Sequence, residues 1–154
     1  PMNAFLLLQG IETLSLRMDR HISNTRELLK YLSSHDQVSW VNHPDMPNHD
    51  SNALAKKYMP KGAGSIITFG VKGGREAGKA FIENVKLASH LANVGDAKTL
   101  IIHPATTTHS RIDADALVAA GITEDMIRIS VGIENVADIQ DDFNKGFRAA
   151  KKYS

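Results

Sequence analysis

The segment 124–143 contains one residue whose type and position suit anion binding. Ile127 and Ile129 alternate with Arg128 and Ser130, which is the period-two pattern of a half-buried strand. An arginine on such a strand presents a planar set of donors that matches a carboxylate, and it keeps its charge. Arg128 is therefore a candidate carboxylate-binding residue. The alternatives are a structural ion pair and a solvent-exposed strand residue, and the pattern alone does not separate them.

The other residues with chemical potential show weaker patterns. His103 and His109 lie six residues apart across a proline and a run of threonines, but no carboxylate nearby could share a metal with them. We interpret them as a strand-end and a loop histidine, and we predict no metal site. The glycine-rich segments 61–65 and 71–76 match neither G-x-x-x-x-G-K-[ST] nor G-x-G-x-x-G, so they are interpreted as turns rather than phosphate-binding loops.

Composition argues against several classes of protein. The 154 residues carry 18 Lys and Arg against 17 Asp and Glu, so no basic surface indicates nucleic acid or an anionic membrane as a partner. Cysteine is absent, which excludes disulfides, thiolate metal sites and a cysteine nucleophile and agrees with a cytoplasmic location. No apolar run has membrane-spanning length, and no signal-peptide pattern is present. Because the chain begins with Pro1 rather than Met, we expect a fragment or a processed product.

A long helix is predicted from Met2 to about Ser34. Apolar residues follow three-four spacing over this range, and Pro1 fits the first turn of a helix. Such a helix would be on the order of 45 Å long at ~1.5 Å per residue, longer than a small domain needs for its own core. Its first turns, NAFLLLQGIETL, are apolar nearly all round. We therefore assign residues 1–34 as a connecting helix that contacts a part of the protein outside this chain.

Short strands alternate with helices over residues 35–154. Strands are predicted at 37–44, 65–71, 98–104 and 126–131, with a brief extended piece at 90–94, and helices at 51–59, 75–89, 113–121 and from Asn135 onward. This order predicts an α/β domain with helices packed on one face of a four- to five-stranded sheet. The opposite face then carries Arg128 and Ser130 together with Thr68 and Gly70. That polar face is expected to meet a ligand or another domain.

Four segments of the chain together resemble one known family. In order they are PMNAFLLLQGIETLSLRMDRH, KGAGSIITFGVKGG, NVGDAKTLIIHPATTTH and IRISVGIENVADIQDDF. They are similar to the C-terminal portion of the pyridoxal-phosphate enzymes of cysteine and methionine metabolism, and within that family to the O-acetylhomoserine sulfhydrylases. The resemblance covers the chain from Pro1 to Ser154. It implies the small C-terminal domain of a fold-type-I enzyme, normally a homotetramer, whose large domain carries the cofactor lysine.

The resemblance also implies roles for two residues. Arg128 matches the arginine with which the family binds the substrate α-carboxylate. Asn93 matches a position where many relatives have serine, in a segment that lines the substrate and the cofactor lysine. The segment Asn93–Thr99 departs from the SLGGVES-type pattern of the lyases and synthases at Asn93, Asp96 and Lys98. It is sulfhydrylase-like, which implies sulfide rather than cysteine as the acceptor.

The implied reaction of the full-length enzyme is the synthesis of homocysteine from O-acetylhomoserine and sulfide, in methionine biosynthesis, with pyridoxal 5'-phosphate as cofactor. The Ser-x-Thr-Lys context of the Schiff-base lysine is absent here, and the resemblance places it, with the phosphate-binding segment, upstream of Pro1. We therefore expect the isolated chain to bind no cofactor tightly and to be inactive without the N-terminal large domain. The alternatives are a cystathionine γ-synthase or γ-lyase type of enzyme, and a non-catalytic interaction domain.

Overall fold

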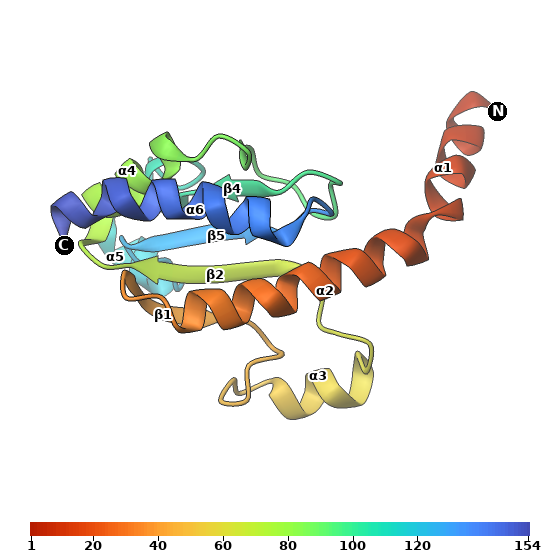
Figure 1. The fold of residues 1–154 in the computed structure, drawn as a ribbon, viewed down its shortest axis with the longest axis horizontal. Helices are drawn as coiled ribbons and strands as arrows, with labels where there is room; N and C mark the ends of the chain where they lie inside the picture. Colours follow the sequence, from red (N-terminus) through yellow and green to blue (C-terminus); the bar gives the residue numbers. More distant parts are fainter.

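The protein, studied as a computed structural model, is described over residues 1–154 except for the side chain of Ala114. The described residues form a five-stranded sheet in the order β1-β2-β5-β4-β3 (Figure 1). The strands are β1 (Val38–Asn42), β2 (Ile66–Val71), β3 (Ser89–His90), β4 (Leu100–Ile102) and β5 (Met126–Ser130). Strand β5 is central and antiparallel to β2 and β4, β1 is antiparallel to β2, and β3 is parallel to β4. The predicted α/β fold is confirmed.

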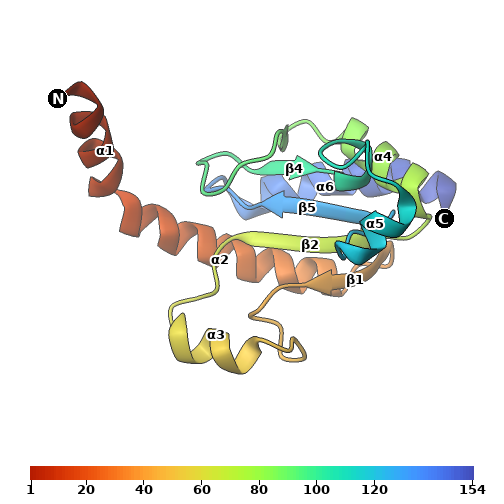
Figure 2. The ribbon, with the colours of Figure 1, turned by 180° about the vertical axis from the view of Figure 1, so that it is seen from behind.

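Three helices cover one face of this sheet. The helices are α1 (Met2–Glu12), α2 (Leu14–Ser33), α3 (Asn52–Tyr58), α4 (Gly74–Asn84), α5 (Ala114–Ala119) and α6 (Val136–Ala150), with 3-10 turns at Pro104–Thr106 and Lys151–Tyr153. Helices α2, α4 and α6 lie in front of the sheet in Figure 1 and behind it in Figure 2, where the short α5 is on the near side. Helix α6 begins where predicted, and Asn135 caps it, since its side chain accepts from the backbone N–H of Ala137.

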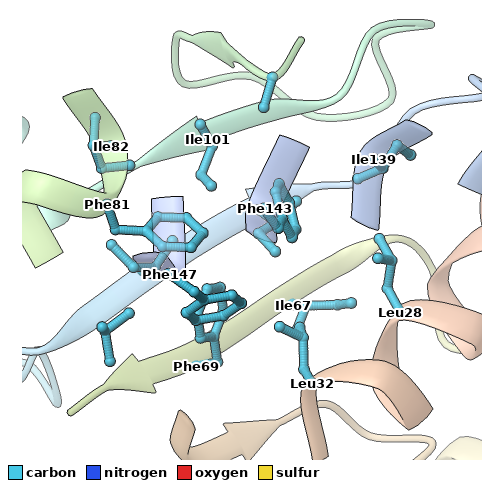
Figure 3. Close-up of a cluster of buried hydrophobic side chains, with 14 of the residues drawn as sticks. Leu28, Leu32, Ile67, Phe69, Phe81, Ile82, Ile101, Ile139, Phe143 and Phe147 are labelled. Atoms are coloured by element: carbon cyan, nitrogen blue, oxygen red, sulfur yellow. The ribbon is translucent and has the colours of Figure 1, made fainter. Parts of the chain in front are cut away.

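The core lies between the sheet and these three helices, and phenylalanine rings fill its centre (Figure 3). The ring of Phe81 on α4 lies 4.7 Å from that of Phe147 and 5.7 Å from that of Phe143, both on α6. From β2 and β5, Ile67, Phe69, Ile127 and Ile129 enter this core and are fully buried. Since side chains alternate along a strand, the residues between them face the other side of the sheet. Arg128 is one of these.

The helix predicted over residues 75–89 ends earlier, at Asn84. Val85 is extended, with φ −82° and ψ 148°. The following backbone N–H groups, those of Lys86, Leu87 and Ala88, bind the carboxylate of Asp142 instead of continuing the helix. The apolar spacing of the segment gives no sign of this distant partner.

The predicted single helix over residues 1–34 is two helices that meet at Thr13. Thr13 has φ −106° and ψ 6°, outside helical geometry, and the side chain of Arg17 donates to the freed carbonyl of Gly10. The glycine weakens the helix near the bend, and α1 has no buried residue that would keep it in line with α2. Figures 1 and 2 show α1 projecting away from the domain. Three-four spacing detects helical residues but not such a bend.

Helix α2 continues into the domain and is fixed by polar as well as apolar contacts. Leu28 and Leu32 are fully buried in the core. His21, also buried, donates from Nδ1 to the carbonyl of Val131 at 2.6 Å. The helix is thereby joined to the end of the central strand.

Within the described residues, no helix combines the length and the apolar character that crossing a bilayer requires.

Candidate substrate-binding site

Arg128 lies in the middle of β5, on the face opposite the core. Its strand partners are Thr68 on β2 and Ile102 on β4, so the backbone is held from both sides. Its guanidinium donates from Nη2 to the backbone carbonyl of Asn93 at 3.4 Å. Arg128 forms no ion pair with any carboxylate among the described residues. The structural ion-pair interpretation is therefore not supported, and the charge is available to an external anion.

The guanidinium forms the charged part of a pocket of about 400 Å³. The pocket is lined by Ala92, Asn93, Val94, Ile102, Pro104, Thr108, His109, Ile122, Met126 and Arg128. Most of these side chains are apolar, and Arg128 is the one residue of the lining that is charged at every physiological pH. An apolar pocket with one fixed cation suits a small aliphatic molecule that ends in a carboxylate.

The two predicted site residues, Arg128 and Asn93, lie together at this pocket. Asn93 contacts the arginine through its backbone carbonyl, whereas its side-chain oxygen accepts from the N–H of Val94 at 2.9 Å. Further along the segment, Asp96 accepts from the N–H of Lys98 at 3.0 Å. Asp96 and Lys98 therefore shape a turn and do not line the pocket. Two of the positions that depart from the lyase pattern therefore lie outside the pocket lining.

His109 lines the pocket although its sequence context indicated an ordinary loop residue. Its Nδ1 lies 2.8 Å from the Thr108 hydroxyl. Nothing local in the sequence marks it, because only the path of the segment after β4 brings it to the pocket that Arg128 also lines. A larger groove of about 810 Å³ lies elsewhere, between α2 and the segment around α3, and contains none of these residues.

His103, in contrast, has a structural role, in agreement with its interpretation as a strand-end histidine. It is fully buried, its Nε2 donates to the carbonyl of Glu124 at 2.8 Å, and its Nδ1 lies 2.8 Å from the Thr106 hydroxyl. Burial lowers the pKa of His103, and the Glu124 carbonyl opposes this shift without reversing it. Gly78 leaves room for the ring, since a Cβ there would lie 2.7 Å from Nε2. Both nitrogens are thus occupied within the protein.

Ser130, two residues beyond Arg128, is fully buried, and its hydroxyl has no hydrogen-bond partner among the described residues. An unpaired buried hydroxyl costs free energy, because it has lost its bonds to water. We predict that Ser130→Ala raises the free energy of unfolding by about 1 kcal/mol. Thermal melting of the variant measures this, and Ser23→Ala on the surface is the matched control. A lower melting temperature for Ser130→Ala would show that the hydroxyl is bonded in solution.

A family model described as the Cys/Met metabolism PLP-dependent enzymes matches residues 1–148. The chain belongs to this family. Among its relatives, the homocysteine synthase of Schizosaccharomyces pombe is 50% identical over 150 residues, which are 97% of this chain and 35% of that protein. The O-acetyl-L-homoserine sulfhydrylase 1 of Thermus thermophilus is 49% identical over 91% of this chain and 33% of its own length. The chain thus spans about a third of these Cys/Met metabolism enzymes.

Solved structures of the Cys/Met metabolism enzymes share the fold. The cystathionine γ-synthase of Xanthomonas oryzae, in complex with aminoacrylate and cysteine, has a TM-score of 0.90 and 34% identity over 100% of this chain and 40% of that one. A protein from Campylobacter jejuni that contains N'-pyridoxyl-lysine-5'-monophosphate has a TM-score of 0.88 and 38% identity over 96% of this chain and 35% of that one. Both structures match nearly the whole of this chain and only about a third to two-fifths of their own length.

The residues of the pocket fit one part of the chemistry of this family. Arg128 and the apolar walls suit the carboxylate and the aliphatic chain of an amino-acid substrate. Among the described residues, the lining contains neither a lysine nor a glycine-rich phosphate-binding segment that would hold pyridoxal phosphate.

Proposed function

We propose that the full-length protein makes homocysteine from O-acetylhomoserine and sulfide with pyridoxal phosphate, and that this chain supplies the substrate-carboxylate site. The observation that carries the proposal is the guanidinium of Arg128, which has no ionic partner among the described residues and stands at an apolar pocket in a chain of this family. The cofactor, when bound, supplies the electron sink that lets a γ-substituent leave the substrate.

Within this proposal, Arg128 binds and orients the substrate. Two parallel hydrogen bonds to the α-carboxylate fix the direction of the substrate as well as its distance from the sheet. The backbone carbonyl of Asn93 steadies the guanidinium from one side. Ile102 and Met126 line the pocket and exclude water from the aliphatic part of the substrate. Fixing the substrate in this way lowers the entropic part of the activation barrier.

Sulfide is proposed as the acceptor because a homocysteine synthase and an O-acetyl-L-homoserine sulfhydrylase are among the relatives. They are 50% and 49% identical to this chain. A cystathionine γ-synthase is the second candidate, because the Xanthomonas oryzae enzyme superimposes on all of this chain. Its complex with cystathionine also shows a small amino-acid ligand in that protein.

Competition in the full-length protein tests the choice. O-acetylhomoserine is offered with equal concentrations of sulfide and cysteine, and the products are separated and quantified. We expect homocysteine to be the main product. Predominant cystathionine would favour the γ-synthase. No consumption of O-acetylhomoserine with either acceptor would contradict both assignments and leave the γ-lyase type of enzyme and the non-catalytic domain.

The same proposal includes the organisation of the full-length protein. Residues 1–34 connect the cofactor domain to the α/β domain of residues 35–154. The exposed apolar side chains of α1, such as Phe5 and Leu7, then contact a part of the protein outside this chain. A homotetramer in the cytoplasm, with methionine biosynthesis as its role, completes the proposal. Light scattering of the purified protein tests the tetramer, and fractionation of the source cells tests the cytoplasmic location.

A further inference from the structure

We propose that Glu134 is a positioning residue for the Arg128 site, acting through Thr99 on the loop of residues 91–98 that contacts the guanidinium. The inference rests on the proposed role of Arg128 as the carboxylate-binding residue. It assigns a function to a carboxylate that touches neither the pocket nor Arg128.

The carboxylate of Glu134 binds Thr99 with both oxygens. Oε1 accepts from the backbone N–H of Thr99 at 2.7 Å, and Oε2 accepts from its hydroxyl at 2.9 Å. The same hydroxyl accepts from the N–H of Gly132 at 3.0 Å. Thr99 is fully buried, so its donors are satisfied by Glu134 rather than by bulk water. The three residues form a closed ring of hydrogen bonds at the end of β5.

Helix α2 holds this ring of hydrogen bonds in place. Asn24 on α2 donates to the carbonyls of Gly132 and Glu134, at 2.9 and 2.8 Å. Gly132 also has no room for a side chain, because a Cβ there would lie 2.2 Å from Oε2 of Glu134 and 2.4 Å from the backbone nitrogen of Thr99. The segment 132–134 is therefore held to the helix layer, and Thr99 is held to that segment.

Thr99 in turn determines where the loop ends. It is the residue before β4, and its carbonyl accepts from the N–H of Ser89, the first residue of β3, at 2.9 Å. The loop of residues 91–98 leaves β3 and returns to β4 at this point. Between its ends lies Asn93, whose carbonyl accepts from Arg128. A displacement of Thr99 therefore moves both the loop and the group that steadies the guanidinium.

The loop has little else to hold it. None of residues 91–98 is buried, and the side-chain hydrogen bonds of Asn93 and Asp96 stay within the loop. One backbone bond, from Ile133 to the carbonyl of Ala97 at 2.9 Å, supplements the contact through Thr99. Loss of the Glu134 carboxylate should thus release the loop without removing any side chain from the hydrophobic core.

The test compares Glu134→Ala, Glu134→Gln and Asp125→Ala in the full-length protein, with hydrogen exchange of residues 91–98 and steady-state kinetics as readouts. For Glu134→Ala we expect at least about tenfold faster exchange in the loop and a roughly 10- to 100-fold lower kcat/KM for O-acetylhomoserine, mainly through KM, as for a misplaced binding group. Glu134→Gln should retain most of the loop's protection from exchange and most of kcat/KM. Its amide can accept from the Thr99 N–H and donate to the Thr99 hydroxyl.

Asp125→Ala is the matched control, since this carboxylate also accepts two hydrogen bonds, here from the side chains of Ser39 and Trp40, but at the other end of β5. It should leave loop exchange and kcat/KM unchanged. Unchanged exchange or unchanged kcat/KM in Glu134→Ala would overturn the inference. If the wild-type protein makes no homocysteine, the proposed function fails, and the exchange of the loop alone decides whether Glu134 positions it.

Discussion

Replacing Arg128 with alanine in the full-length protein is expected to lower kcat/KM for O-acetylhomoserine roughly 10- to 150-fold. The reason is the loss of charge-assisted hydrogen bonds to the α-carboxylate, which are worth about 1.5–3 kcal/mol. The fold should persist, because the guanidinium lies outside the core and has no ionic partner among the described residues. Steady-state kinetics measure the loss of catalytic efficiency, and a melting curve shows whether the fold has been destabilised.

Two further variants make this result specific. Arg128→Lys should recover only part of the loss, since an ammonium group keeps the charge but not the paired donors. Arg26→Ala removes an exposed arginine of α2, paired with Asp45 at 3.6 Å, and should leave kcat/KM unchanged. Unaltered kinetics in Arg128→Ala would instead identify Arg128 as an ordinary exposed strand residue.

Replacing Asp142 with alanine is expected to lower the free energy of unfolding by about 3 kcal/mol, since hydrogen bonds to a charged group are worth about 1.5–3 kcal/mol each. The Asp142 side chain, on α6, is 1% exposed and accepts from the N–H groups of Lys86, Leu87 and Ala88 at 2.8–3.1 Å. Without it, these donors lose a charged acceptor, and the segment between α4 and β3 loses these hydrogen bonds to α6. Chemical denaturation and thermal melting of the full-length protein measure the effect.

Asp142→Asn should be nearly as destabilising as Asp142→Ala, because one of the two carboxylate oxygens becomes an NH₂ group that faces backbone donors. The neighbouring Asp141→Ala is the control. Its side chain is exposed, so a change within about 0.5 kcal/mol is expected. Equal stability of the Asp142→Ala and Asp141→Ala variants would show that water replaces the buried carboxylate without cost.

Local patterns predicted the parts of the molecule that depend on neighbouring residues. Alternation at 127–131 predicted that Arg128 faces away from the core, since the period of a strand is a property of the backbone. The helix predicted from Asn135 onward matches α6, since helix capping also depends on neighbouring residues. The carboxylate-binding role of Arg128 itself came from the resemblance, and it remains a proposal.

Long-range partners were beyond these patterns. Asp142 and Glu134 read as ordinary acidic residues around the start of a helix, yet their hydrogen-bond partners lie 35 to 56 residues away. His109 reaches the pocket only through the path of a loop. The bend at Thr13 reflects which contacts α1 lacks within the domain, and apolar spacing carries no information about that. Each of these features depends on tertiary structure rather than on sequence neighbours.

The placement of Arg128 on the central strand, with pocket walls from the segments on either side of β4, has a consequence for how new specificities arise. A shift of the arginine would disturb the pairing of β2, β5 and β4 together, so the proposed carboxylate contact is difficult to move by small steps. Ala92, Val94 and Thr108 belong to segments outside the sheet and tolerate exchange far more readily. Directed evolution of this protein toward longer or bulkier amino acids should therefore alter those positions and keep the arginine.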